Sequence, residues 1–148
     1  YALRPLPLDE LGFFPALRQF AHDFGGQTGL HIEVYPVGPP ERLPALLELI
    51  VFRMIQEALS NISKHAQARE AHIELDLQTP DQLRLTIRDD GHGFDPATLD
   101  EAVARGHLGL AHLRQRVQDL HGQLTLTSQP GSGTEISVTL PLRWARGG

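Results

Sequence analysis

The segment LRLTIRDDGHGF, residues 83–94, decides the fold of this chain. Its apolar residues alternate with polar ones, as in a β-strand with one buried face, and they are Leu83, Leu85 and Ile87. Asp89 continues the buried phase, whereas Asp90 points to the opposite side. The sequence therefore predicts a strand whose last inward-facing residue is a carboxylate.

A carboxylate in that position is costly unless it accepts hydrogen bonds. The amino group of an adenine ring is one donor, and Gly91 and Gly93 would let the backbone turn tightly and approach a flat ring. By itself the segment is more often an ordinary strand that ends in an Asp-Gly turn. A calcium loop is less favoured still, because the alternating Asp/Asn pattern of an EF-hand is missing. Ligand binding must therefore be judged together with the other motifs.

The rest of the chain alternates between helical and extended patterns. Helices are expected at 14–27, 45–65 and 110–120, with a single helical turn near 98–104, and strands at 31–37, 71–77, 83–90, 124–128 and 134–142. This order predicts an α/β (α+β) two-layer sandwich, with a mixed sheet of about five strands and helices on one face. Residues 1–12 are proline-rich and are expected to form a linker, 13–142 one domain, and 143–148 a tail.

Composition narrows the function. The 148 residues are 41% hydrophobic, which suits one domain with a real core. The net charge of −5 disfavours general nucleic-acid binding. The absence of cysteine excludes disulfides and iron–sulfur clusters, and the eight histidines form no HExxH pair, which disfavours a metal held by protein ligands alone. No positively charged, hydrophobic segment of the signal type opens the sequence, and no apolar run is long enough to span a bilayer, so we expect no membrane contact by this domain.

A polar stripe runs along the long predicted helix. Glu57, Asn61 and His65 are four residues apart and share one face, with Lys64 beside them. Asn61 offers an oxygen to Mg²⁺, which usually takes few protein ligands, while Lys64 can meet phosphate charge and Glu57 can accept a proton or orient a nucleophile. Taken alone, such a stripe is more often a solvated helix face.

Two further segments bear chemistry. In GHLGLAHLRQR, residues 106–116, glycines precede a helix start, which is a ready anion site, although a flexible loop with a glycine hinge is equally compatible. It is neither a Rossmann fingerprint nor a Walker loop. In GSGTEISVTLPL, residues 131–142, Thr134 has the same parity as the buried residues of the strand, so its hydroxyl should face inward and needs a partner. Thr134 and Asp89 could together bind one polar edge of a ring through a bridging water. A strand-starting threonine after a glycine turn is also common.

The order and spacing of these motifs are more specific than any one of them. QEALSNISKHA (56–66), DDGHGF (89–94), GHLGLAHLRQRV (106–117) and PGSGTEISVTLPL (130–142) together resemble the N box and glycine boxes of histidine kinases, in the superfamily shared with gyrase, heat-shock chaperone and mismatch-repair ATPases. Only residues 94–108 separate Gly93 from Gly109, and this short lid resembles the sensor kinases that pair with NarL-type regulators. The resemblance implies a Bergerat-type ATP-binding catalytic domain.

The resemblance also implies roles for individual residues. Asp89 would accept the adenine amine, Gly91 and Gly93 would shape the pocket, and Thr134 would support Asp89. The phosphate end would be served by Asn61 on Mg²⁺, by Glu57 as the catalytic carboxylate, and by Lys64, His65, Gly106, Gly109 and Leu110 near the phosphates. Two departures are visible: GHLG spaces its glycines by three rather than two, and His112 stands where the family commonly has a small residue.

The implied activity is transfer of the γ-phosphoryl group of Mg-ATP to a histidine on a dimerisation hairpin outside this chain, for signalling to a response regulator in the cytoplasm or on the cytoplasmic side of a membrane-bound sensor. HDFGGQ at 22–27 mimics an acceptor motif, but His22 lies only 35 residues before Glu57, which leaves no room for a hairpin, so we expect a surface histidine. A nucleotide-binding regulatory module without transfer activity and a serine kinase of the anti-sigma type are the alternatives. The abrupt start at Tyr1 is what we expect of a piece of a longer protein.

Overall fold

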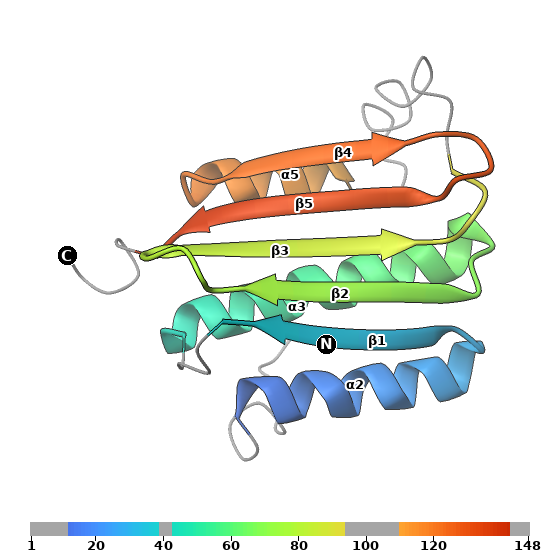
Figure 1. The fold of residues 1–148 in the computed structure, drawn as a ribbon, viewed down its shortest axis with the longest axis horizontal. Helices are drawn as coiled ribbons and strands as arrows, with labels where there is room; N and C mark the ends of the chain where they lie inside the picture. The colour runs from blue at the N-terminus through green and yellow to red at the C-terminus, as the bar shows by residue number, and fades with distance from the viewer. Residues whose placement is uncertain (1–11, 39–42, 94–109, 143–148) are drawn as a thin grey trace.

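The computed structural model describes residues 12–38, 43–93 and 110–142, and it contains one five-stranded sheet with helices packed on it (Figure 1). The strands are β1 (His31–Val37), β2 (Glu70–Asp76), β3 (Gln82–Asp89), β4 (Gln123–Ser128) and β5 (Thr134–Pro141). The helices are α2 (Phe13–Thr28), α3 (Ala45–Asn61) and α5 (Leu110–Asp119), and a π-helical turn, η1 (Ile62–Ala66), follows α3.

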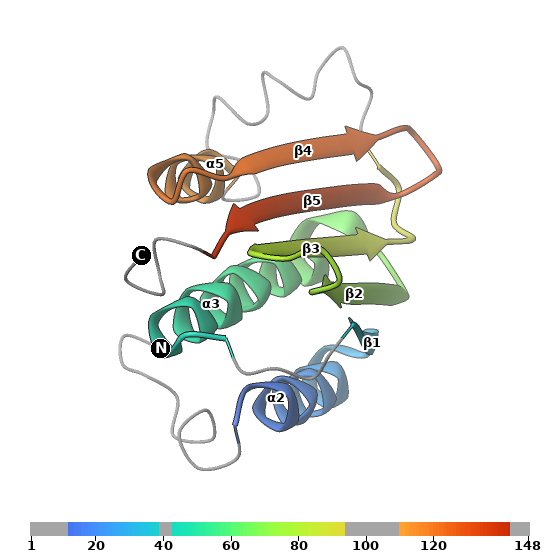
Figure 2. The ribbon, with the colours of Figure 1, turned by 60° about the vertical axis from the view of Figure 1, so that its left-hand side comes forward.

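The sheet is mixed, with strand order β1-β2-β3-β5-β4. β1 and β2 are parallel, whereas the pairs β2–β3, β3–β5 and β5–β4 are antiparallel. All three helices lie on the same side of the sheet (Figure 2), so the two-layer α/β sandwich predicted from the sequence is confirmed.

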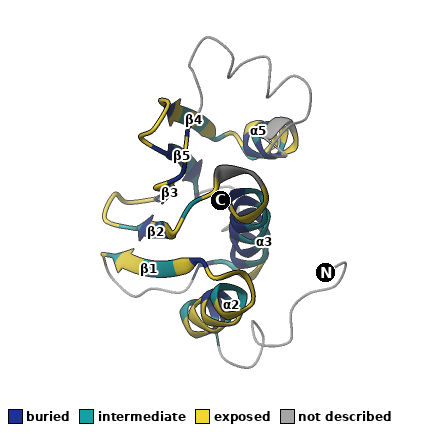
Figure 3. Cartoon of the chain, turned by 90° about the vertical axis from the view of Figure 1, so that its right-hand side faces the viewer, coloured by how far each residue is buried: buried dark blue, intermediate teal, exposed yellow. Residues whose placement is uncertain are grey.

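The core lies between the helices and the inner face of the sheet (Figure 3). The alternating residues of β3 that parity places inward, Leu83, Leu85 and Ile87, are at most 2% exposed. α3 lies behind the middle of the sheet and presents its apolar stripe to it, a stripe that includes Leu47, Val51, Met54, Ile55 and Leu59. Burial of these large side chains supplies the main driving force for folding.

The structure departs from the predicted helix over 45–65 at its last turn. The α-helix ends at Asn61, and residues Ile62–Ala66 form a π turn that closes at Gln67 with a φ of 53°. A π turn holds more residues than an α turn, so it rotates the side chains that follow. The α-helical spacing of the stripe of Glu57 and Asn61 therefore ends at Asn61.

The remaining elements match their predicted ranges closely. α2 ends at Gly29, which takes the left-handed conformation at a φ of 80° and donates its amide to the Gly25 carbonyl oxygen at 2.8 Å. The predicted linker lies outside the described residues except for Gly12, and so do the tail at 143–148 and the helical turn near 98–104. Within the described ranges, none of the helices has the length and apolar character needed to cross a bilayer.

Candidate functional site

The polar residues predicted for ligand binding gather at one end of the sheet. The C-terminal end of β3, the start of β5 and the C-terminal end of α3 all lie at the same end of the molecule, on the right in Figure 1. Asp89 closes β3, and Thr134 opens β5 directly opposite it in the antiparallel register. This edge therefore combines segments that are about seventy positions apart in the chain.

Asp89 is a buried carboxylate, with 5% of its surface exposed. Burial raises the pKa of Asp89 above its ordinary value, and the backbone amides of Gly91 and Thr134 oppose that rise. The Gly91 amide donates to Oδ1 of Asp89 at 2.8 Å. The group is thus a hydrogen-bond acceptor kept in a poorly solvated position, which suits it to recognise a ligand donor.

Asp90 lies on the other side of the strand and has a structural role. Its Oδ1 accepts the backbone amides of Arg69 at 2.8 Å and Glu70 at 2.9 Å, where β2 begins. The Glu70 amide is the largest cause that lowers the pKa of Asp90. The separation of the two aspartates by strand parity is therefore confirmed, whereas the tie between Asp90 and β2 was not foreseen from the sequence.

Thr134 is also buried, and a second hydroxyl orients it. Oγ1 of Thr134 lies 2.9 Å from Oγ of Ser128, which in turn donates to the Gly133 carbonyl oxygen at 3.1 Å. Because a serine hydroxyl has a single proton, Thr134 is the donor in this pair, and its oxygen keeps acceptor capacity. Sequence reasoning missed Ser128, although it shares the inward parity of Leu124 and Leu126 on β4.

The turn after β3 packs directly on the turn between β4 and β5. Gly93 has a φ of 68°, and a Cβ added there would overlap the Gln129 carbonyl oxygen. The amide of Gly131 donates to the His92 carbonyl oxygen at 2.6 Å. Only a glycine at position 93 permits this close approach of the two turns.

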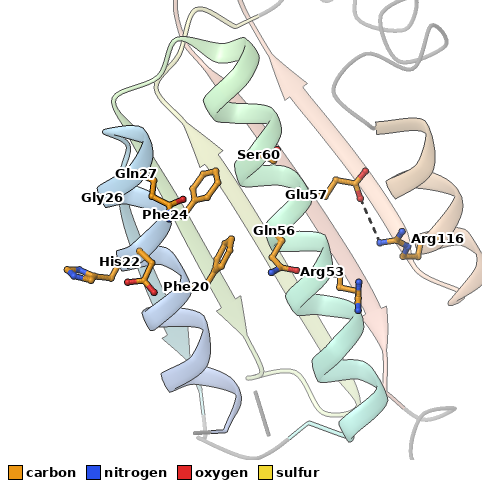
Figure 4. A pocket seen from close by; sticks show the side chains of 11 residues that line it. Phe20, His22, Phe24, Gly26, Gln27, Arg53, Gln56, Glu57, Ser60 and Arg116 are labelled. Carbon is orange, nitrogen blue, oxygen red and sulfur yellow. Dashed lines mark ion pairs between the residues drawn. The ribbon is translucent and has the colours of Figure 1, made fainter. Parts of the chain in front are cut away.

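The residues of the helical stripe lie in the last two turns of α3 and on the π turn that follows. Asn61 ends α3 and is half-buried, and Lys64 is exposed on the π turn that follows. Glu57 lines a groove of about 810 Å³ on the helical face, between α2, α3 and α5 (Figure 4). Neither Asp89 nor Thr134 lines this groove.

Glu57 has an ion-pair partner that the sequence did not reveal. Oε2 of Glu57 lies 3.8 Å from Nη1 of Arg116 on α5, and the two side chains are 31% and 41% exposed respectively. His22 also lines the groove and is exposed on α2, as expected of a surface histidine.

The segment predicted to bind phosphate, residues 106–116, is described only in part. Gly106 and Gly109 lie outside the described residues, Leu110 is the first residue of α5, and His65 belongs to the π turn. Within the described part of the chain, no group of three or more His, Asp or Glu side chains could hold a metal ion. An asparagine oxygen is a suitable ligand for Mg²⁺ that arrives with phosphate ligands of its own, because Mg²⁺ in such sites uses few protein groups, and Asn61 is the candidate for this role.

Comparison with known protein families gives one match over most of the domain. The family described as "Histidine kinase-, DNA gyrase B-, and HSP90-like ATPase" matches residues 47–143. This range includes both ends of the candidate site, from Asn61 on α3 to Thr134 on β5.

Curated relatives are sensor kinases. The signal transduction histidine-protein kinase/phosphatase DegS of Brevibacillus brevis is 36% identical over 142 residues, which cover 96% of this chain and 36% of DegS. The nitrate/nitrite sensor protein NarX of Escherichia coli (strain K12) is 31% identical over 134 residues, covering 90% of this chain and 22% of NarX. The chain thus spans about a third or less of the length of these two relatives.

Solved structures with the same fold include other kinases. The histidine kinase domain of the Erythrobacter litoralis EL346 blue-light activated histidine kinase superposes with a TM-score of 0.72 at 25% identity, over 90% of this chain and 62% of that one. The Acinetobacter baumannii histidine kinase AdeS superposes with a TM-score of 0.65 at 18% identity, over 89% of this chain and 64% of that one. At this identity the likeness shows the fold alone.

Proposed function

The chain belongs to the family of histidine kinase-, DNA gyrase B- and HSP90-like ATPases, and from that premise we propose that it binds Mg-ATP and transfers the γ-phosphoryl group to a histidine outside the chain. Members of this family bind ATP, so the domain uses a nucleotide. The observation that carries the proposal is the buried Asp89 carboxylate, held opposite Thr134 at the end of the sheet. It is a buried hydrogen-bond acceptor, suited to the exocyclic amine of adenine.

In this proposal the adenine end of the ligand is bound by Asp89, Thr134 and the glycine turn after β3. Asp89 accepts the amine, and the Thr134 hydroxyl, oriented by Ser128, offers an acceptor beside it for a bridging water. Gly91 and Gly93 would shape the pocket, because they let the backbone turn tightly after Asp89 and pack on the turn between β4 and β5. These roles are supported by the burial of Asp89 and by the close contact between the turn after β3 and the turn between β4 and β5.

The phosphate end lies toward the end of α3 and the start of α5. Asn61 would hold Mg²⁺, which when bound neutralises phosphate charge. Lys64 and His65 on the π turn would lie near the phosphates, and Gly106, Gly109 and Leu110 would offer amides at the start of α5. Support for this end comes from α3, whose last residue is Asn61 and whose C-terminal end lies at the same end of the molecule as the C-terminal end of β3 (Figure 1).

Transfer requires a nucleophile and a base. In the proposed reaction an imidazole nitrogen of the acceptor forms a bond to the γ-phosphorus, and the bond from that phosphorus to the β–γ bridging oxygen breaks, releasing ADP. The imidazole gives up one proton, and Glu57 is the carboxylate proposed to accept it. Catalysis would then consist mostly of positioning and charge neutralisation.

Partners follow from the relatives. DegS and NarX are named as a kinase/phosphatase and a sensor protein, and we infer that this chain likewise works beside a dimerisation hairpin carrying the acceptor histidine. A NarL-type response regulator would receive the phosphoryl group, in the cytoplasm. Binding of nucleic acid is not expected at a net charge of −5.

The test separates binding from transfer. Mg-ATP is titrated into the chain by calorimetry, and the chain is then incubated with radiolabelled ATP and a separate polypeptide carrying the acceptor hairpin. Binding followed by acid-labile phosphate on the hairpin is the expected result. The absence of binding at millimolar Mg-ATP would refute the proposal. Binding without transfer would favour the regulatory module, and acid-stable phosphoserine on a partner would favour a kinase of the anti-sigma type.

A further inference from the structure

The ion pair between Glu57 and Arg116 joins two elements of the helical layer. Glu57 belongs to α3 and Arg116 to α5, and in the described part of the chain both line the groove that also contains Arg53 and Ser60 (Figure 4). Because both side chains are partly exposed, the pair contributes little to the stability of the fold. Its presence at a proposed catalytic carboxylate therefore calls for another explanation.

The position of Arg116 is set by the packing of α5. Leu113 and Val117, on either side of it in the helix, are 3% and 0% exposed, and they anchor α5 against the core. A helix held by these two residues presents Arg116 at a fixed place beside α3. Both side chains of the pair have several rotamers, and the contact between them favours the Glu57 rotamer that reaches toward α5.

The groove makes the carboxylate accessible to another side chain. Its volume of about 810 Å³ exceeds that of an imidazole, and one wall is formed by the stacked rings of Phe20 and Phe24, whose centroids are 5.5 Å apart. A base must lie within hydrogen-bond reach of the proton that it accepts, and small errors in its placement are costly. Control of the Glu57 rotamer is thus a requirement of the proposed reaction.

We propose that Arg116 is a positioning residue that holds the Glu57 carboxylate in place for phosphoryl transfer. The inference rests on the proposed function, since it assigns Glu57 the role of base. Arg116 acts through Glu57 and touches neither the nucleotide nor the acceptor in this scheme. Loss of the guanidinium should therefore slow transfer while ATP binding is kept.

The experiment uses the full-length protein, in which the domain is joined to its acceptor hairpin, and compares Arg116→Ala, Arg116→Lys and wild type. We expect Arg116→Ala to lower kcat about tenfold, consistent with the cost of small misplacements, with the KM for ATP unchanged within roughly twofold. Arg116→Lys keeps a cation in reach of the carboxylate and should restore kcat to within about threefold of wild type.

A double-mutant cycle tests whether Arg116 acts through Glu57. In a Glu57→Gln background, Arg116→Ala should cause no further loss of residual transfer, because the carboxylate that it positions is gone. Arg84→Ala is the matched control: Arg84 lies on the outer face of the sheet, where its Nε donates to Ser137 at 3.4 Å, and its loss should leave kcat unchanged.

Several outcomes would overturn the inference. These are a wild-type kcat in Arg116→Ala, a loss confined to the KM, failure of lysine to restore any activity, or an equal loss in both Glu57 backgrounds. If Glu57→Gln leaves no measurable transfer, the inference is judged from the two Arg116 variants alone. A kcat of Arg116→Lys that is no higher than that of Arg116→Ala would then overturn it. A wild-type protein that binds no ATP would refute the proposed function itself, which is a separate result.

Discussion

At the scale of single residues, two adjacent aspartates have opposite environments. Asp89 is buried opposite Thr134, whereas Asp90 is exposed and accepts the two amides at the start of β2. Strand parity explains the difference, because successive residues of a strand point to opposite faces. One carboxylate is thereby available to a ligand and the other is committed to the fold.

Substitution of Asp89 by asparagine should separate binding from stability. Asp89→Asn replaces a charged acceptor with a neutral one, and charged hydrogen bonds are about twice as strong, so we expect ATP affinity to fall by roughly tenfold or more. The ligand-free variant should be no less stable than wild type, since it removes a charge that burial disfavours. Calorimetric titration and urea unfolding measure the two effects. Wild-type affinity in this variant would contradict the adenine role.

Asp90 provides the matched control at the neighbouring position. Asp90→Ala leaves the amides of Arg69 and Glu70 without their acceptor, and the exposed location limits the expected loss of unfolding free energy to about 1 kcal/mol. Affinity for ATP should stay within about twofold of wild type. Asp89→Asn should therefore weaken ATP binding without loss of stability, whereas Asp90→Ala should lower stability without weakening ATP binding.

The raised pKa of Asp89 gives its contribution to stability a definite pH dependence. Between the ordinary value of 3.8 and the raised value, the native state keeps a proton that the unfolded chain releases. Its contribution to the unfolding free energy therefore falls as pH rises through that window and stays low above it. We predict that the stability of Asp89→Asn relative to wild type rises across the window in urea titrations at successive pH values. A difference that does not vary with pH would show that Asp89 titrates normally.

At the scale of elements, the site depends on two turns in close contact. Gly133 has a φ of 79°, and an added Cβ would overlap the carbonyl oxygen of Asp89. Gly131 has the same φ of 79°, but nothing lies within 4 Å of an added Cβ. The two glycines therefore separate the cost of backbone conformation from the cost of a steric clash.

We expect Gly133→Ala to destabilise the fold by more than 3 kcal/mol, since it combines a left-handed alanine with displacement of the β3 end. Gly131→Ala should cost only about 1–2 kcal/mol, the conformational part alone. Urea unfolding of the two variants gives the comparison. Equal losses would mean that the contact between the turns contributes nothing to the fold.

The sequence predicted most elements because their signals are local. Alternation at 83–90 and 134–142 located β3 and β5 to within a residue or so, and Gly29 marked the end of α2. The π turn was not predictable, because one extra residue in a single turn hardly disturbs a helical pattern of apolar residues. The Glu57–Arg116 pair also escaped prediction, since it depends on how α5 packs beside α3.

At the scale of the whole molecule, the site is assembled from distant segments by the order of the strands. β5 lies between β3 and β4, and this brings Asp89, Thr134 and Ser128 together although they come from three different strands. A ligand that contacts this group is bound by the native state and not by the unfolded chain. Binding and global stability are therefore linked.

This linkage makes nucleotide selectivity measurable as stability. At a free ligand concentration about 100-fold above its Kd, Mg-ATP should add about 2.7 kcal/mol to the unfolding free energy, which corresponds to a rise in Tm of several degrees. Mg-GTP should add much less, because guanine places a carbonyl oxygen where adenine has its amine, and two acceptors would then face each other at Asp89.

Thermal unfolding with each nucleotide, in wild type and in Asp89→Asn, completes the test. The asparagine amide can donate as well as accept, so the difference in Tm between ATP and GTP should shrink in the variant. A wild-type domain that ATP and GTP stabilise equally would bind through its phosphates alone. Asp89 would then be a buried structural carboxylate, with no part in reading the base.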